Sequence, residues 1–469
     1  MAGEVEVGSL ERFLSAVSAA VPAAAAGVSD SPLADWECQP LWGHSGRQFG
    51  AAFAPLRGGS GTGAALGQLQ LLATASEDQT ARVWDAGSGK CVRCLDGAHA
   101  DEVLRVAWSG DAAHLATGGA DGVAKLWRVG SDPTADWPCV AALEHGEGKQ
   151  IYALQYLQQQ QQQQQQQPAG DTASEGQLLL TAVDDTVALW DVGVEELAQS
   201  WTFPTVGCGP GHGGAKRNPD ETVDVFDVAV SPTTSAEAAS APGGGREGLL
   251  AVALGDGSVR VLDRRSPSLV ALLEAAPGAS AAVTGACFSP SGDELVSCAT
   301  DGCAMVWDCR AWGAARHTLQ DAAGKGQPLF GCLFWPAGGT DVLLWSSSGA
   351  LVGYDAADAR RLGSHTCVSQ KTKGRYPVFD VAVASGGTHV AAVGGLSEQQ
   401  ADAGSSGWGV PSQLWQQQSA VSDEASDAGA KRAADGASGA PRAVKRPKAE
   451  GSKPGATGLG AEGDLSWLA

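Results

Sequence analysis

The chain has 469 residues, 43% of them hydrophobic, so it can bury a large core; its formal net charge is −21 and its pI about 4.7. An acidic surface opposes phosphate binding, because nucleic-acid affinity depends largely on Lys and Arg. We see no signal peptide and no apolar stretch of bilayer length, and the 11 cysteines are scattered. We therefore expect a reducing intracellular compartment, with no direct binding to nucleic acid or membrane.

The first predicted element is a short amphipathic helix within the N-terminal segment 1–34. Between Gly8 and Ala20, apolar residues recur at helical spacing: Leu10, Phe13, Leu14 and Val17. Such a helix either lies against the following domain or docks into a partner's groove. After it, Asp35–Leu41 (DWECQPL) is a strand-like segment.

Five copies of one short unit follow. Each has an almost wholly apolar first strand, typical of a strand covered on both faces, then a polar turn with an Asp. An alternating second strand follows and ends on a large residue six positions after the Asp. The Asp and the large residue are Asp78 and Trp84, Asp121 and Trp127, Asp184 and Trp190, Asp256 and Leu262, and Asp301 and Trp307.

Two weaker units extend the series: Val342–Asp355, and Val378–Gly395 together with Ser412–Gln417. Three of the six spacings between anchors fit a period of ~40–45 residues, and the other three contain insertions. The insertions are loop-like in composition and lie near 158–176, 204–220, 232–248 and 396–411. The polyglutamine tract Gln158–Gln167 is either a neutral expansion or a regulatory segment.

The units resemble WD40 repeats, and the dipeptide Trp-Asp closes three of them, at 84–85, 190–191 and 307–308. Gly43-His44 precedes the first unit as the family's Gly-His pair would. The resemblance covers about 35–418 and implies an all-β fold: a seven-bladed β-propeller with four strands in each blade. We expect Asp35–Leu41 to supply the outer strand of the last blade, near Trp415, and so to close the ring.

In this family a His, a Ser or Thr, the turn Asp and the Trp of one blade hydrogen-bond to one another. By the resemblance, only the first unit supplies all four, as His44, Ser76, Asp78 and Trp84. Gly119 and Ala299 stand where the hydroxyl would be in two later units. The expected structural network therefore also includes His99, Asp121, Trp127, Asp184, Trp190, Asp256, Asp301 and Trp307.

We find no motif that predicts an enzyme. Gly209, Gly211 and Gly214 spell GxGxxG, but Pro210 interrupts it and no helix pattern follows. The pair Cys91 and Cys94 has no second pair at zinc spacing, so we expect buried or half-buried thiols. No GxSxG elbow and no cluster with metal-ligand spacing occurs. We therefore expect a non-enzyme with no catalytic, cofactor-binding or metal-binding residues.

Asp-x-Arg follows the second strand in two successive units and ends at Arg265 and Arg310. This resembles the element by which WD40 substrate receptors of cullin-4 ubiquitin ligases contact their adaptor, and Arg suits such contacts. Alternatively, each Arg forms a salt bridge with the neighbouring blade. Tryptophans outside the anchors are either binding hot spots or packing between blades: Trp137, Trp201, Trp312 and Trp408.

The tail 419–469 is rich in Ala, Gly, Ser, Asp and Lys, and we expect it to be disordered. Its two basic clusters resemble a bipartite nuclear localisation signal: Lys431 and Arg432, then Lys445, Arg446 and Lys448. The alternative is a solvated charge run and a cytoplasmic protein. Together these features predict a non-catalytic nuclear scaffold in a multiprotein complex, with an import receptor among its partners. The alternative is a cullin-4 ligase receptor that binds the ligase adaptor.

Overall fold

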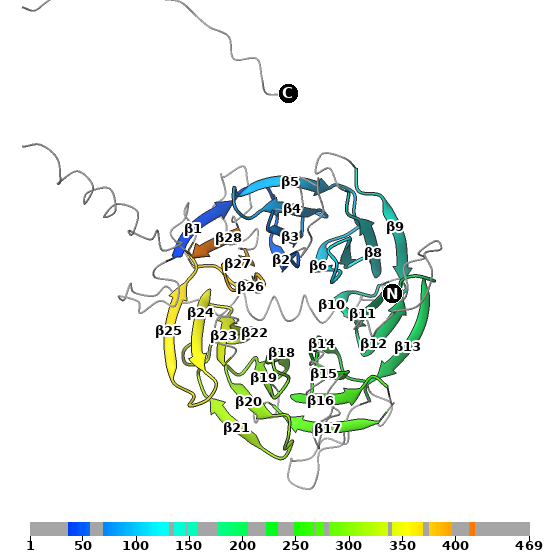
Figure 1. Ribbon diagram of the computed structural model, residues 1–469. Coiled ribbons are helices and arrows are strands. Elements are labelled where there is room, and N and C mark those ends of the chain that lie inside the picture. The colour runs from blue at the N-terminus through cyan, green and yellow to red at the C-terminus, as the bar shows by residue number, and fades with distance from the viewer. Residues whose placement is uncertain are drawn as a thin grey trace, which may run out of the picture. The chain divides into compact units, whose positions relative to one another are not determined.

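The computed structural model describes residues 36–56, 69–130, 136–146, 148–157, 177–204, 222–232, 248–265, 268–275, 281–335, 340–368, 375–395 and 412–417. Every regular element within these ranges is a β-strand, and the strands form seven antiparallel sheets of four. The sheets stand as blades around a central axis (Figure 1), so the predicted seven-bladed β-propeller is confirmed. The predicted helix at 8–20 and the tail 419–469 lie outside the described residues.

In blades 1 to 6 the four strands run from the axis outward in chain order, and in blade 7 the first strand of the chain takes the outermost place. The innermost strands of blades 1 to 7 are β2 (Gln48–Phe53), β6 (Val103–Trp108), β10 (Ile151–Leu157), β14 (Val225–Val230), β18 (Val283–Phe288), β22 (Leu329–Trp335) and β26 (Val378–Val383). The second strands are β3 (Leu71–Ser76), β7 (His114–Gly119), β11 (Leu178–Val183), β15 (Leu249–Leu254), β19 (Glu294–Ala299), β23 (Asp341–Ser346) and β27 (His389–Gly394).

The two outer positions of each blade complete the sheets. The third strands are β4 (Ala81–Asp85), β8 (Val123–Arg128), β12 (Thr186–Asp191), β16 (Ser258–Asp263), β20 (Ala304–Asp308), β24 (Ala350–Asp355) and β28 (Ser412–Gln417). The outermost strands are β5 (Lys90–Leu95), β9 (Cys139–Glu144), β13 (Glu196–Thr202), β17 (Leu269–Glu274), β21 (Ala315–Leu319), β25 (Arg361–Thr366) and β1 (Trp36–Leu41). No helix long and apolar enough to cross a membrane occurs in the ranges given above.

Blade 7 joins the two ends of the propeller. Its sheet order is β1-β28-β27-β26, and β1 pairs antiparallel with β28 from Trp36↔Gln417 to Leu41↔Ser412. Leu41 is buried in one cluster with Leu414 of β28 and Trp84 of blade 1. The prediction that the segment ending at Leu41 closes the ring beside Trp415 is therefore confirmed.

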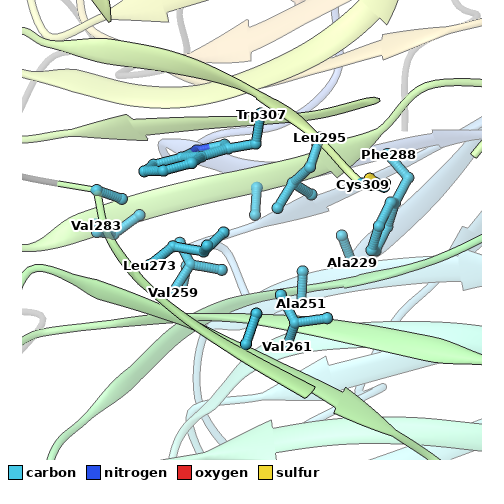
Figure 2. Close-up of a cluster of buried hydrophobic side chains, with 14 of the residues drawn as sticks. Ala229, Ala251, Val259, Val261, Leu273, Val283, Phe288, Leu295, Trp307 and Cys309 are labelled. Carbon is cyan, nitrogen blue, oxygen red and sulfur yellow. The ribbon is translucent and has the colours of Figure 1, made fainter. Parts of the chain in front are cut away.

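The hydrophobic core is divided among the spaces between adjacent blades. Between blades 4 and 5, side chains of β16 and β17 meet those of β18, β19 and β20 in one buried cluster. Figure 2 shows Val259, Leu273 and Val283 within it, close to Trp307. Since each inner strand contacts the next around the ring, packing between neighbours fixes the blades relative to one another.

β-Bulges at corresponding positions in the blades determine the face of the sheet from which the neighbouring side chains project. Each innermost strand has one register shift after its first residue, and each outermost strand except β1 has one where it passes the end of the third strand. A bulge adds one residue, so side chains three positions apart come to the same face. Cys91 and Cys94 of β5 are such a pair, opposite Trp84 and Arg82.

Candidate functional site

Blade 1 contains a chain of four hydrogen-bonded side chains. Trp84 Nε1 donates to Thr74 Oγ1 at 2.8 Å, and Thr74 Oγ1 lies 2.8 Å from His44 Nε2. His44 Nδ1 lies 3.0 Å from Asp78 Oδ2. With Nδ1 protonated, each group in the sequence Trp84, Thr74, His44, Asp78 donates to the next. These hydrogen bonds link the turn after β3, which contains Asp78, to the segment before β2, which contains His44.

Burial and hydrogen bonding set the protonation of this network. Burial lowers the pKa of His44, although Asp78 acts against this, so the imidazole is neutral at neutral pH. Burial raises the pKa of Asp78, but donors from His44, Thr80 and the Ser45 amide outweigh it and hold the pKa well below its usual range. The carboxylate is therefore ionised and fixed.

The hydroxyl of this network was wrongly predicted. Thr74 supplies it, while Ser76 lies at the turn and accepts the Asp78 amide at 3.3 Å. Thr74 occupies the middle of β3, opposite Arg82, where the indole of Trp84 can reach diagonally across the sheet. Ser76 lies beyond the last paired residue of β3 on β4 and so cannot meet that indole.

Blade 2 repeats the full network, so the expectation that only the first unit is complete is also wrong. Thr117 Oγ1 accepts Trp127 Nε1 at 3.0 Å and lies 2.8 Å from His99 Nε2. His99 Nδ1 lies 2.9 Å from Asp121. Gly119 is not the hydroxyl position, because the relevant residue is two positions earlier. A hydroxyl ten residues before the anchor Trp is the sequence signal that was missed.

Blade 3 keeps only part of the network. Trp190 Nε1 donates to Thr181 at 3.1 Å, and His145 Nε2 lies 2.8 Å from the same hydroxyl. The link between β11 and β12 is shorter here: Thr181 precedes Trp190 by nine residues, and Asp184 has a positive φ of 46°. Asp184 is paired with Lys149 instead of the imidazole.

Blades 4 and 5 retain still less. Trp307 Nε1 donates to Ser297 at 3.0 Å, so Ala299 is not the hydroxyl position in blade 5, and Asp301 accepts the amide of Cys303. In blade 4, Asp256 accepts the Ser258 amide at 3.0 Å and pairs with Arg260 at 3.1 Å. Both Asp residues therefore bind groups two to four residues further along the chain, and neither has a described hydrogen bond to a His.

The trio Thr74, His44 and Asp78 has the connectivity of a hydrolase triad. One observation argues against nucleophilic chemistry. Thr74 has 0% of its surface exposed, whereas a nucleophile needs access to substrate. In the described ranges, moreover, no group of three His, Cys, Asp or Glu residues could hold a metal ion.

Two carboxylates on the innermost strands were missed by the sequence analysis. Asp227 and Asp380 occupy the third position of identical hexapeptides, VFDVAV, in β14 and β26. Asp227 accepts the amide of Ala286 in blade 5 at 3.1 Å, and Asp380 accepts that of Ala51 in blade 1 at 2.9 Å. Each therefore links its blade to the next, and the repeated hexapeptide was the signal available in the sequence.

The pKa of Asp380 makes stability depend on pH. Burial raises it to about 6 from 3.8, against the opposing charge of Arg105. Because the folded carboxyl holds its proton more tightly than the unfolded one, this contribution is complete below about pH 4 and is lost as pH rises through about 6.

We expect wild type to lose stability relative to Asp380→Asn between pH 4 and 7, by up to about 3 kcal/mol. The amide keeps an acceptor for Ala51 but does not titrate. Urea unfolding of both proteins at the two pH values measures the difference. Asp227→Asn should show the same direction, since burial also raises the pKa of Asp227. An identical difference at both pH values would contradict the assignment.

The two Asp-x-Arg turns share one conformation. In each, Nε and Nη2 of the Arg donate to the two oxygens of the Asp two residues earlier, at 3.0 and 2.9 Å for Arg265 and at 2.8 and 2.7 Å for Arg310. The Arg side chains are 53% and 57% exposed. The pairing holds each guanidinium within its own turn, on successive blades 4 and 5.

The remaining predictions on single residues have mixed outcomes. Trp137 and Trp201 are buried, and Trp137 packs against Trp108, so both contribute to packing and not to exposed hot spots. Trp312 is half-buried against the cluster between blades 4 and 5. Cys94 is half-buried as predicted, but Cys91 is exposed. Trp408 and the five basic residues of the tail lie outside the described ranges.

Comparison with known proteins agrees with this geometry. A family model described as "WD domain, G-beta repeat" matches residues 62–85, 89–128 and 270–308. The chain is 37% identical over 110 residues to a probable cytosolic Fe-S cluster assembly factor of Schizosaccharomyces japonicus, covering 23% of this chain and 16% of that protein. It is 31% identical over 159 residues to the nuclear distribution protein PAC1 of Arthroderma benhamiae, covering 32% of each.

A further relative is the mouse F-box-like/WD repeat-containing protein TBL1X. It is 28% identical over 177 residues, covering 35% of this chain and 27% of that protein. The chain thus spans about a sixth to a third of the length of these relatives. Such partial matches carry the repeat architecture, and the activities of the relatives do not follow from them.

Proposed function

Because this chain belongs to the WD40-repeat family of β-propellers, we propose that it is a non-catalytic scaffold that holds proteins of a nuclear complex together. The burial of Thr74 beneath Trp84 carries this proposal. The groups that could do chemistry in the best-formed networks instead fix the turns of the blades. A ring fixed in this way offers rigid faces and loops on which partners can bind.

The nuclear part of the proposal depends on the basic clusters of the tail. Seven-bladed rings occur in proteins of many roles, so the fold itself does not indicate a compartment. Lys445, Arg446 and Lys448 are concentrated positive charge in a chain of net charge −21. An acidic import receptor would recognise such a cationic segment.

Purification of the tagged chain from nuclear extract tests the scaffold, and the localisation of tail variants tests the import signal. The tagged chain should be recovered from nuclear extract in a fixed ratio with other proteins, at a mass well above its own 47.5 kDa. A variant with Lys445, Arg446 and Lys448 replaced by Ala should move to the cytoplasm, whereas Lys453→Ala should stay nuclear. Recovery as a free monomer would refute the scaffold. A triple variant that remains nuclear would refute the import signal alone.

A substrate receptor of a cullin-4 ubiquitin ligase is the second candidate. The observation that favours it is the pair of exposed Asp-x-Arg turns with the same conformation on successive blades. Planar, multidentate guanidinium groups held in one orientation suit a protein contact. Exposed ion pairs contribute little to stability, so the Arg replacements should leave the fold intact.

The same purification distinguishes this candidate from a general scaffold. Replacing Arg265 and Arg310 together by Ala should remove the ligase adaptor from the recovered proteins. Arg316→Ala is the matched control, because Arg316 is an exposed, ion-paired arginine on β21 of the same blade as Arg310, outside the turn. Equal recovery of the adaptor with wild type and the double variant would rule out this second candidate.

A further inference from the structure

The outermost strand of each blade is a sheet edge, and β17 is the least protected of the seven. Edge strands commonly carry Lys, Arg or Pro, which discourage pairing with another chain. Such residues occur in β1, β5, β21 and β25. β9, β13 and β17 contain none, and among these β17 alone exposes three large aliphatic side chains: Leu269, Val270 and Leu272.

The bulge in β17 arranges these side chains. Leu269 lies opposite Leu262, and Leu272 opposite Arg260, so both project from the same face of the sheet. On the other face, Ala271 and Leu273 are buried between blades 4 and 5, where Figure 2 shows Leu273 beside Val259. Packing on one face therefore holds the strand in place, while Leu269 and Leu272 remain 50% and 41% exposed.

The main-chain groups on the outer side of β17 are also available to pair with a further strand. β17 ends the sheet order β14-β15-β16-β17, and no other described strand pairs with its outer side. An extended chain added there would gain main-chain hydrogen bonds and place alternate side chains beside the exposed leucines. Affinity would come from the backbone and the apolar contact, and orientation from the charges at the two ends of the strand.

Those charges differ in sign. The turn before β17 carries Arg264, Arg265 and Asp263, with the last two paired, which leaves one net positive charge. At the other end, Glu274 is exposed. A chain antiparallel to β17 would have its C-terminal end at the arginine turn and its N-terminal end at Glu274. The edge therefore complements a segment that is basic at its start, aliphatic at alternate central positions and acidic at its end.

We propose that β17 is a docking edge for an extended segment of this kind in a partner protein, bound by antiparallel strand addition. The inference deepens the proposed scaffold function, since it names the chemistry of one partner and the strand that receives it. A homodimer through two β17 edges is the competing occupant. A two-fold pairing would place Glu274 of one copy toward the arginine turn of the other.

The test uses the full chain and a labelled peptide, acetylated and amidated, of sequence Lys-Val-Thr-Val-Thr-Val-Glu-Glu. We expect saturable binding by fluorescence anisotropy and slower hydrogen exchange of the amides in 268–275. Leu272→Lys should weaken binding by about tenfold or more, because it removes apolar contact and adds an edge charge. Leu362→Lys, at an exposed leucine on β25, is the matched control and should change affinity by less than about twofold.

Two further peptides test the mode of binding. Proline at the central Val removes an amide donor and should abolish binding, and reversing the charge order should weaken it. Equal binding of the proline peptide, protection outside 268–275, or indifference to Leu272→Lys would overturn the proposal. Circular dichroism of Leu272→Lys checks folding, and Leu269→Lys serves as a second variant at a similarly exposed position.

Sedimentation across a range of protein concentrations resolves the remaining alternative. A dimer that Leu272→Lys abolishes would assign the edge to a second copy and overturn peptide docking. The experiments distinguish a wrong proposal about β17 from a wrong proposal about the scaffold function. A stoichiometric nuclear complex with no peptide binding at β17 would remove only the docking edge. Peptide binding at β17 by a chain that is otherwise recovered alone would remove only the scaffold.

Discussion

Replacing Thr74 by Val should lower the free energy of unfolding by about 3 kcal/mol, because two buried polar partners would lose their hydrogen bonds at once. The Trp84 indole N–H would have no acceptor and the His44 Nε2 no donor. Valine has nearly the same volume, so the loss reports on the hydroxyl. Urea unfolding followed by far-ultraviolet circular dichroism measures the change.

Ser76→Ala is the control for this prediction. Ser76 is equally buried. Of the hydrogen bonds described above, its hydroxyl takes part in one, which it accepts from the Asp78 amide at 3.3 Å. We expect a loss of about 1 kcal/mol or less. If Ser76→Ala destabilised the protein as much as Thr74→Val, the assignment of the network hydroxyl to Thr74 would be wrong.

Replacing Leu41 by Asp should have a larger effect, about 4 kcal/mol or more, because it places an unpaired carboxylate in an apolar cluster. Leu41 is 1% exposed and packs with Leu414 and Trp84. The change should also weaken the pairing of β1 with β28. Urea unfolding gives the overall loss, and hydrogen exchange should show faster exchange of the amides in 412–417.

Glu37→Ala on the same strand is the control. It shows whether any substitution in β1 lowers stability, or only one that disturbs the cluster at the junction of the two ends of the ring. Glu37 is exposed and pairs with Gln416, so its side chain can be removed without opening the cluster around Leu41. Its effect should stay within about 0.5 kcal/mol. A Leu41→Asp protein that unfolds at the wild-type urea concentration would show that blade 7 is held without β1.

The repeat made the ring predictable because each unit carries its own signal. An apolar strand, a turn Asp and a large anchor recur often enough to number the blades, even where Leu262 replaces the anchor Trp. Closure by the segment ending at Leu41 was predictable as well, because a propeller needs a partner for its last sheet. The spacing along the chain thus determined which strands share a blade.

The details of the networks were less predictable, because they depend on side-chain geometry across strands. Thr74 and Ser76 point to the same side of β3, and only the diagonal reach of Trp84 selects Thr74. In blade 3, a turn shorter by one residue moves Asp184 away from His145 and toward Lys149. Asp227 and Asp380 act on amides of the next blade, a contact that no pattern within a single unit contains.

The pairing of β1 with β28 imposes an order on biosynthesis. Leu41 is synthesised 371 residues before its partner Ser412 (412 − 41). At about 5–20 residues per second, a ribosome needs roughly 20–75 s to cover that interval. During this time Trp36–Leu41 has no partner strand in its sheet, and the last blade can assemble only after Ser412–Gln417 has been synthesised.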